Sequence, residues 1–225
     1  MVAEAPSFSS QLFAFLRELE QHNERGWFNA NKARYERDVK EPALAFVEDI
    51  GYRLPQVAPH LTADKRSLFR IYRDTRFSKD KTPYETHVGI YLRHARSADA
   101  DTAGLYLHLE PGHVFLGAGI WHPGTPALKR LRDALVARPD GWREAVAAVE
   151  PTWKLADGES LKRPPAGYRK DHPLIEDVKR KSFAITSPLT QREVTGSGFL
   201  DEVEARAARA RPFMAFLCSA LGVEY

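Results

Sequence analysis

Hydrophobic positions along the chain change their period twice, first from helical to alternating spacing and later back again. In residues 9–22, leucine and phenylalanine recur at helical spacing behind a serine, which predicts a capped amphipathic helix. A second helix is predicted over residues 25–39. Pro42 suits the first turn of a third helix, which we expect to end before Pro55. The opening of the chain is therefore predicted to be all-helical.

Alternation of apolar and polar residues then predicts a sheet in the middle of the chain. The predicted strands cover residues 67–74, 86–93, 104–110 and 113–121. Pro111 and Gly112 form a turn dipeptide at hairpin length between the last two strands. Because only one side of each strand is apolar, we expect an antiparallel sheet with one face packed on helices.

Helical spacing returns after Trp121, with Thr125 as the expected cap and Pro126 at the first helical position. A long connection rich in proline, glycine and charge follows at residues 151–172, and such loops inside a domain are usually binding loops, lids or linkers. The other elements predicted in this part are helices at 140–149, 174–181 and 199–221 and a strand at 182–186.

These elements predict a single α+β domain over residues 1–225. It is expected to be helical over 9–55, sheet-rich over 67–121, and helical with one short strand over 125–221. We predict an antiparallel sheet of about five strands, with the N-terminal and C-terminal helices packed mainly on one face.

Composition fits a soluble protein with one large core. The chain has 225 residues, of which 43% are hydrophobic and 28% charged. No apolar run approaches the roughly 20 residues that span a bilayer, and the N-terminus has an acid where a secretion signal carries lysine or arginine. We therefore expect a cytoplasmic protein with no membrane partner. Cys218 is the only cysteine, which excludes an intrachain disulfide and cysteine-based zinc sites, and its apolar neighbours predict a buried thiol.

The net charge of +3 hides a local excess of positive charge between Lys65 and Lys81. This segment holds seven basic and two acidic side chains, a net of +5, so the rest of the chain is slightly acidic. Basic residues mixed with aromatic rings are typical of anion-binding sites, phosphate sites above all. A second basic stretch, residues 162–181, is expected to be either a solvated surface or a lid over the sheet.

The polar face of the predicted sheet gathers arginine, histidine, tyrosine and carboxylate side chains around Gly117 and Gly119, which would leave space above it. This composition favours a ligand site, and the alternative is a polar surface that faces solvent or is covered by other helices. Asp74 is expected to orient an arginine, and a rigid loop braced by arginine–aspartate pairs is the alternative for the whole arginine cluster. The residues predicted to bind a ligand are Arg70, Tyr72, Arg73, Asp74, Arg76, Lys81, Tyr84, His87 and Trp121.

His108 and Glu110 lie two residues apart on one predicted strand face, about 7 Å apart by strand rise. If the protein is an enzyme, we predict them to be its catalytic acid–base pair. The pair also has the chemistry of metal ligands, with a third ligand from His87, His113 or His122. An ordinary hydrogen-bonded histidine is the default interpretation of this spacing, so the sequence assigns no metal. The cofactor, if the protein uses one, stays unknown.

Spacing around the basic segment resembles the signature of a known family. Its fixed positions here read Arg70-x-x-Arg73-Asp74-x-Arg76-Phe77-x-x-x-Asp80-Lys81-x-Pro83-Tyr84. The same pattern includes Asn23, Arg25, Trp27-Phe28 and Asn31-Lys32 in the helical opening, and the segments YLHLEPGHVFLGAGIWHP and LKRPPAGYRKDHPLIEDVKRKSF. On these residues nearly the whole chain resembles the family of bacterial proteins, with fungal relatives, catalogued as domain of unknown function 2461. The resemblance implies one domain of this length and no established activity, cofactor or catalytic residue.

The leading functional hypothesis is a cytoplasmic protein that binds a phosphorylated or otherwise anionic small ligand on the polar sheet face. Whether it is an enzyme or a binding protein stays open. Nucleic-acid binding is one alternative, because basic and aromatic residues also suit single strands, although the modest overall charge and the lack of a recognised motif weigh against it. A structural or partner-docking domain is the other alternative. Ligand identity and oligomeric state stay open as well.

Overall fold

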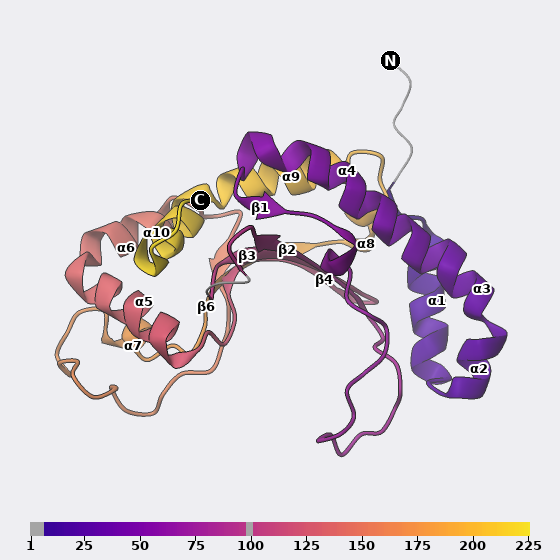
Figure 1. The fold of residues 1–225 in the computed structure, drawn as a ribbon, viewed down its shortest axis with the longest axis horizontal. Coiled ribbons are helices and arrows are strands. Elements are labelled where there is room, and N and C mark those ends of the chain that lie inside the picture. Colours follow the sequence, from indigo (N-terminus) through magenta and orange to yellow (C-terminus); the bar gives the residue numbers. More distant parts are fainter. Residues whose placement is uncertain (1–6, 98–100) are drawn as a thin grey trace.

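An antiparallel sheet covered on one side by helices forms the centre of the computed structural model, which describes residues 7–97 and 101–225 (Figure 1). Residues 1–6, part of the segment expected to lack a secretion signal, lie outside this description. From edge to edge the sheet contains β1 (Leu61–Thr62), β2 (Val88–His94), β3 (Gly104–Glu110), β4 (His113–Ile120), β6 (Phe183–Leu189) and β5 (Lys154–Leu155). All neighbouring strands are antiparallel, which confirms the predicted α+β class.

The helical opening is confirmed, with different boundaries. It contains α1 (Ser10–Gln21), α2 (Arg25–Ala30), α3 (Lys32–Tyr35), the π-helical η1 (Glu36–Lys40) and α4 (Glu41–Val57). The Ser9 side chain caps α1 as predicted, because its hydroxyl accepts a hydrogen bond from the Gln11 amide at 3.3 Å. The second predicted helix is interrupted at Asn31. The predicted end before Pro55 is wrong, because a proline in the last turn removes one hydrogen bond without ending the helix at once.

Helices also follow the central strands, as predicted. They are α5 (Thr125–Ala137), α6 (Pro139–Ala147), α7 (Ile175–Val178), α8 (Gln191–Val194), α9 (Phe199–Arg209) and α10 (Arg211–Leu221), and a short 3-10 turn, η2 (Lys65–Ser67), precedes β2. Gly124 is the N-cap of α5, so Thr125 is its first residue and the predicted cap is one residue late. The predicted final helix is divided at Ala210, because Pro212 fits only the first turn of a new helix.

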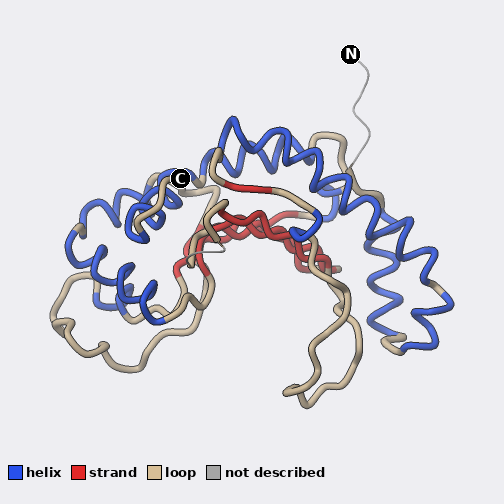
Figure 2. Tube along the Cα trace, in the orientation of Figure 1, coloured by secondary structure: helices blue, strands red, loops and turns tan. Residues whose placement is uncertain are grey.

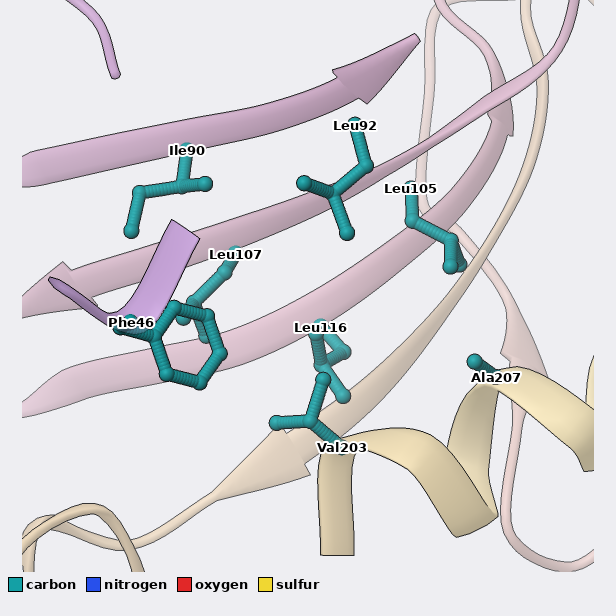
Figure 3. A pocket seen from close by; sticks show the side chains of 8 residues that line it. All are labelled: Phe46, Ile90, Leu92, Leu105, Leu107, Leu116, Val203 and Ala207. Atoms are coloured by element: carbon teal, nitrogen blue, oxygen red, sulfur yellow. The ribbon is translucent and has the colours of Figure 1, made fainter. Parts of the chain in front are cut away.

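Apolar files on the central strands form the core, as the alternation predicted. The buried side chains of these files are Val88, Ile90, Leu92, Leu105, Leu107, Leu109, Val114, Leu116, Ala118 and Ile120. Phe46 on α4 and Val203 on α9 lie over them, around a cavity of about 10 Å³ (Figure 3). A space so small with an apolar lining is a packing defect of the core and has no room for a ligand.

The predicted strand over residues 67–74 is wrong. This segment pairs with β2 only where Leu68 lies opposite Ile90, and it then leaves the sheet. Tyr72 pairs with Tyr84 instead, so residues 72–84 close on themselves; we call them the arginine loop. An extended segment has the same side-chain alternation whichever neighbour it pairs with, so the period alone could not reveal this departure.

Two long loops lie on the side of the sheet opposite α4 and α9: the arginine loop and the connection over residues 156–174 (Figure 2). The second loop is tied to α5, because the Tyr168 hydroxyl donates a hydrogen bond to Asp133 at 2.8 Å. Figure 1 places this connection beside α5 and α7. In the part of the chain that the structure describes, no helix has the length and apolar character needed to cross a membrane.

Candidate functional site

The face of the sheet opposite α4 and α9 carries the polar file that the alternation predicted. Strand pairing places Gly89, His108 and Phe115 in one row and Tyr91, Tyr106 and Gly117 in the next. The aromatic and histidine side chains of both rows are half-buried. They therefore pack on one another and still present atoms to this face.

Two glycines of this face have different surroundings. A Cβ atom at Gly117 would meet only ordinary contacts, the nearest at 3.7 Å, so space is present there as predicted. Gly119 has a φ of +127°, and a Cβ atom on it would come within 2.2 Å of the Phe183 carbonyl oxygen. The backbone of β6 thus occupies the space expected above Gly119, and the expectation of a second hollow is wrong.

His108 is held through both its ring faces and its ring nitrogens. It stacks on His87, with ring centroids 4.4 Å apart, and on Phe115, at 4.9 Å. Its Nδ1 lies 3.1 Å from the Tyr106 hydroxyl and its Nε2 lies 3.1 Å from Glu110 Oε2. Burial lowers the pKa of His108 below its ordinary value, against the opposing effect of Glu110, and burial raises the pKa of Tyr106 to about 12. A neutral imidazole in a fixed orientation follows from these contacts.

A tight turn adds His113 to this group. Pro111 and Gly112 connect β3 to β4, and Gly112 takes a φ of +85° that glycine adopts without strain. Glu110 and His113 are therefore paired across the hairpin, with Glu110 Oε2 3.6 Å from His113 Nδ1. The candidate ligand atoms of His108, Glu110 and His113 all lie within 4.8 Å of one another. We call these three residues the hairpin cluster.

Contacts with α2 and the segment before it fix the arginine loop in place. The Asn23 side chain donates a hydrogen bond to the Tyr84 carbonyl at 2.9 Å and accepts one from the Tyr84 amide at 3.1 Å. The Tyr84 ring also stacks on Phe28, with centroids 4.1 Å apart. Only 3% of Tyr84 is exposed, so this predicted ligand-binding residue is first of all an anchor of the loop.

Arg73 braces the loop from inside. Its Nη1 donates to Asp80 Oδ2 at 2.6 Å, to the Thr82 carbonyl at 3.2 Å and to the Thr82 hydroxyl, and its Nε lies 3.9 Å from Glu85. The Thr82 amide and the Arg73 guanidinium hold the pKa of Asp80 below its usual range. The Nη2 of Arg73 makes no hydrogen bond within the described ranges, so one donor group of this arginine stays available.

The remaining arginines of the predicted set point to other places. Arg76 forms an ion pair with Asp74 at 2.7 Å and has a side chain that is 77% exposed. Arg70 is exposed and has neither a hydrogen bond nor an ion pair to any described residue. Trp121, which is 58% exposed, lies beyond the end of β4. Arg73 is thus paired with Asp80 inside the loop, whereas Arg76 and, through its charge, Arg70 lower the pKa of Asp74, so arginine–aspartate pairs brace part of the loop.

An open groove of about 790 Å³ lies between α2 and the arginine loop. Four of the predicted residues line it, namely Tyr72, Arg73, Lys81 and Tyr84. The helix side contributes Asn23, Glu24, Arg25 and Asn29. We call this space the α2–loop groove. Sequence reasoning did not assign Arg25 or the two asparagines to the site; Asn23 and Arg25 occur in the family pattern, but nothing in the sequence places α2 beside the loop.

A chain of polar contacts connects the groove to the hairpin cluster. Glu85 Oε2 lies 3.9 Å from Arg73 Nε and 3.8 Å from His87 Nδ1, and His87 stacks on His108. Glu85 was not predicted, because it lies just after the signature segment and its role depends on the closing of the loop. His87 therefore belongs with His108 and contacts the groove only through Glu85.

The sequence matches a protein-family model over nearly its whole length. A family model described as conserved hypothetical protein (DUF2461) matches residues 11–216 of the chain. No curated protein matches the chain.

Proposed function

This chain belongs to the DUF2461 family, which confirms the resemblance noted in the sequence, and we propose from the groove that it binds a phosphorylated or otherwise anionic small molecule. The observation that carries the proposal is the pair Arg25 and Lys81, which line the groove from opposite walls. Arg25 has no hydrogen bond or ion pair to a described residue, and Lys81 donates only to the Thr75 carbonyl, at 2.8 Å. In the part of the chain that the structure describes, both cations thus lack a carboxylate partner.

The donor types around the groove suit a phosphate group. A guanidinium offers paired N–H donors that match two phosphate oxygens, and a lysine adds a compact charge. Arg25 would supply the first kind of contact and Lys81 the second, and the Nη2 of Arg73 would add single N–H donors. Tyr72, which is 54% exposed, offers a ring on which the rest of a ligand can pack.

The pairing of the charged groups, and not their sum, favours an anion over a cation or a neutral ligand. Asp80 and Glu85 offset the charge of Arg73, and Glu24 is the acid among the lining residues. These three acids balance the three cations Arg25, Arg73 and Lys81 in number, so the preference for an anion depends on Arg25 and Lys81, which have no carboxylate partner among the described residues. The proposed site is therefore displaced from the sheet face, where the sequence hypothesis put it, to the space between the loop and α2.

Calorimetric titration of the protein with inorganic phosphate, pyrophosphate and a mononucleotide at low ionic strength tests the proposal. Arg25→Ala and Lys81→Ala are each expected to weaken binding at least tenfold, because each removes a charge-assisted contact worth about 1.5–3 kcal/mol. Arg76→Ala is the matched control: it removes a cation from the same loop but outside the groove lining, and affinity should not change.

Stability separates this role from a structural one. Arg25 forms no hydrogen bond or ion pair with a described residue, so Arg25→Ala should change the free energy of unfolding by less than about 0.5 kcal/mol. A large loss of stability in this variant, or equal affinities of Arg25→Ala and Arg76→Ala for every probe, would contradict the proposal.

A random single-stranded oligonucleotide tests the nucleic-acid alternative. Tight, salt-dependent binding that Arg25→Ala leaves intact would favour that alternative. Absence of binding by every small anion would reject the groove as an anion site.

A further inference from the structure

The hairpin cluster has the composition of a metal centre. His108, Glu110 and His113 offer two imidazole nitrogens and one carboxylate oxygen, all within 4.8 Å of one another. Two histidines and one carboxylate are the protein ligands of many catalytic zinc sites and of non-haem iron sites. This composition favours a divalent first-row transition ion over Mg²⁺ or Ca²⁺, which prefer sites made of oxygen alone.

The two distances from Glu110 to the histidines are close to those around such an ion. In a tetrahedral site with metal–ligand bonds of about 2.0–2.1 Å, neighbouring ligand atoms lie about 3.3 Å apart. Glu110 Oε2 lies 3.1 Å from His108 Nε2 and 3.6 Å from His113 Nδ1, on either side of that value. The His113 side chain is 69% exposed, so it can rotate to complete the site without disturbing the core.

The surroundings of His108 orient it as a ligand. Its side chain is only 12% exposed, and the ring is held by stacking on His87 and Phe115. The Tyr106 hydroxyl next to Nδ1 can accept a hydrogen bond, which leaves the Nε2 lone pair directed toward Glu110. Metal-bound histidines usually make this kind of outer contact through their second nitrogen. The Tyr106 hydroxyl can also donate a hydrogen bond to Nδ1. It therefore suits equally well the metal-free tautomer, in which Nε2 carries the proton and donates to Glu110.

We propose that His108, Glu110 and His113 bind a divalent transition-metal ion on the open face of the sheet. All three ligands come from one hairpin, whose register the Pro111-Gly112 turn fixes. Three protein ligands leave at least one coordination position for water or for another ligand. The strand register places the three residues in the polar file, on the face of the sheet that α4 and α9 do not cover (Figure 1). The polar chain through Glu85 and His87 connects the site to the α2–loop groove.

Metal titration of the tag-free, chelator-treated full chain tests this inference. Zn²⁺ and, under anaerobic conditions, Fe²⁺ are titrated in competition with a chromophoric chelator. One equivalent of at least one ion per chain is expected, with a dissociation constant in the micromolar range or tighter. His113→Ala and Glu110→Gln are each expected to weaken binding at least tenfold. Circular dichroism should show that both variants stay folded, because both residues lie at the exposed end of the hairpin.

His60→Ala is the matched control. His60 Nε2 also lies 3.6 Å from a glutamate oxygen, that of Glu224, but this pair belongs to no metal-binding group among the described residues. Its loss should leave affinity unchanged. The visible spectrum of bound Co²⁺ gives a second readout, which His113→Ala should alter and His60→Ala should not. Absence of a stoichiometric ion, or equal weakening by His60→Ala and His113→Ala, would overturn the proposal.

Discussion

Replacing Gly119 with alanine should separate β4 from β6 locally. The residue has a φ of +127°, and a Cβ atom built on it lies 2.2 Å from the Phe183 carbonyl oxygen and 2.7 Å from the Ala184 Cα. Both atoms belong to the backbone of the neighbouring strand, so no side-chain rotation can relieve the contact. The two strands must move apart by about 1 Å for an ordinary contact distance.

The expected cost follows from two contributions. A side chain at this φ costs about 1–3 kcal/mol in backbone strain. Separating the strands at the Gly119–Ala184 pair also leaves buried backbone groups poorly paired, at about 1–3 kcal/mol for each lost hydrogen bond. We expect Gly119→Ala to lower the free energy of unfolding by about 4 kcal/mol, a large part of the stability of an ordinary domain.

Two other glycines of the same face calibrate this value. A Cβ atom at Gly117 meets nothing closer than 3.7 Å, so Gly117→Ala should change stability by less than about 1 kcal/mol. At Gly89 the close atoms, the Tyr106 hydroxyl at 2.9 Å and a Phe69 ring carbon at 3.0 Å, are ends of side chains that can shift. Gly89→Ala should therefore lie between the other two variants.

Urea unfolding followed by tryptophan fluorescence and circular dichroism measures all three variants. Trp142 and Trp153 are fully buried, so their emission should report loss of the core. The ranking of destabilisation should be Gly119, then Gly89, then Gly117. A Gly119→Ala variant within about 1 kcal/mol of Gly117→Ala would refute the steric reasoning.

Two further predictions concern ionisable groups. Hydrogen bonds from Thr190 and the charge of Arg206 hold the pKa of Glu193 below its usual 4.5. The ionised Glu193 therefore stabilises the fold fully above pH 4.5, and this stabilisation is lost as the pH falls through the lowered pKa. Urea midpoints should therefore fall more steeply in the wild type than in Glu193→Gln between about pH 5 and about pH 3, and parallel curves would contradict this. Burial raises the pKa of the Cys218 thiol to about 11, so a thiol reagent at neutral pH should label it only as fast as the protein unfolds, and rapid labelling of the native protein would be the contrary result.

The hairpin and the core files could be predicted from sequence because their signals are local. Alternation over a few residues fixes which side chains of β3 and β4 share a face, and Pro111-Gly112 marks the turn between them. Pairing of His108 with Glu110 follows from the same rule. His113 joins them only through the register of the hairpin. From the sequence alone, it was one of three histidines that could supply a third ligand.

The α2–loop groove could not be predicted, because long-range contacts create it. The Asn23 side chain holds the backbone of Tyr84, a residue 61 positions later. Alternating side chains at 67–74 indicated a strand, yet the pairing partner of Tyr72 is Tyr84 and lies outside the sheet. Charge alone also did not distinguish Arg73, which braces the loop, from Arg25, which has no hydrogen-bond or ion-pair partner among the described residues.

The outermost strands of the sheet are its shortest, since β1 and β5 have two residues each. A strand at the edge of a sheet offers unpaired amide and carbonyl groups to any other polypeptide that comes near. A short edge strand offers only a few such groups in a row. The β-branched and leucine-rich central strands, which would otherwise favour fibril-like stacking, are thereby shielded from intermolecular strand addition. Protection against aggregation thus comes from the two shortest strands of the fold.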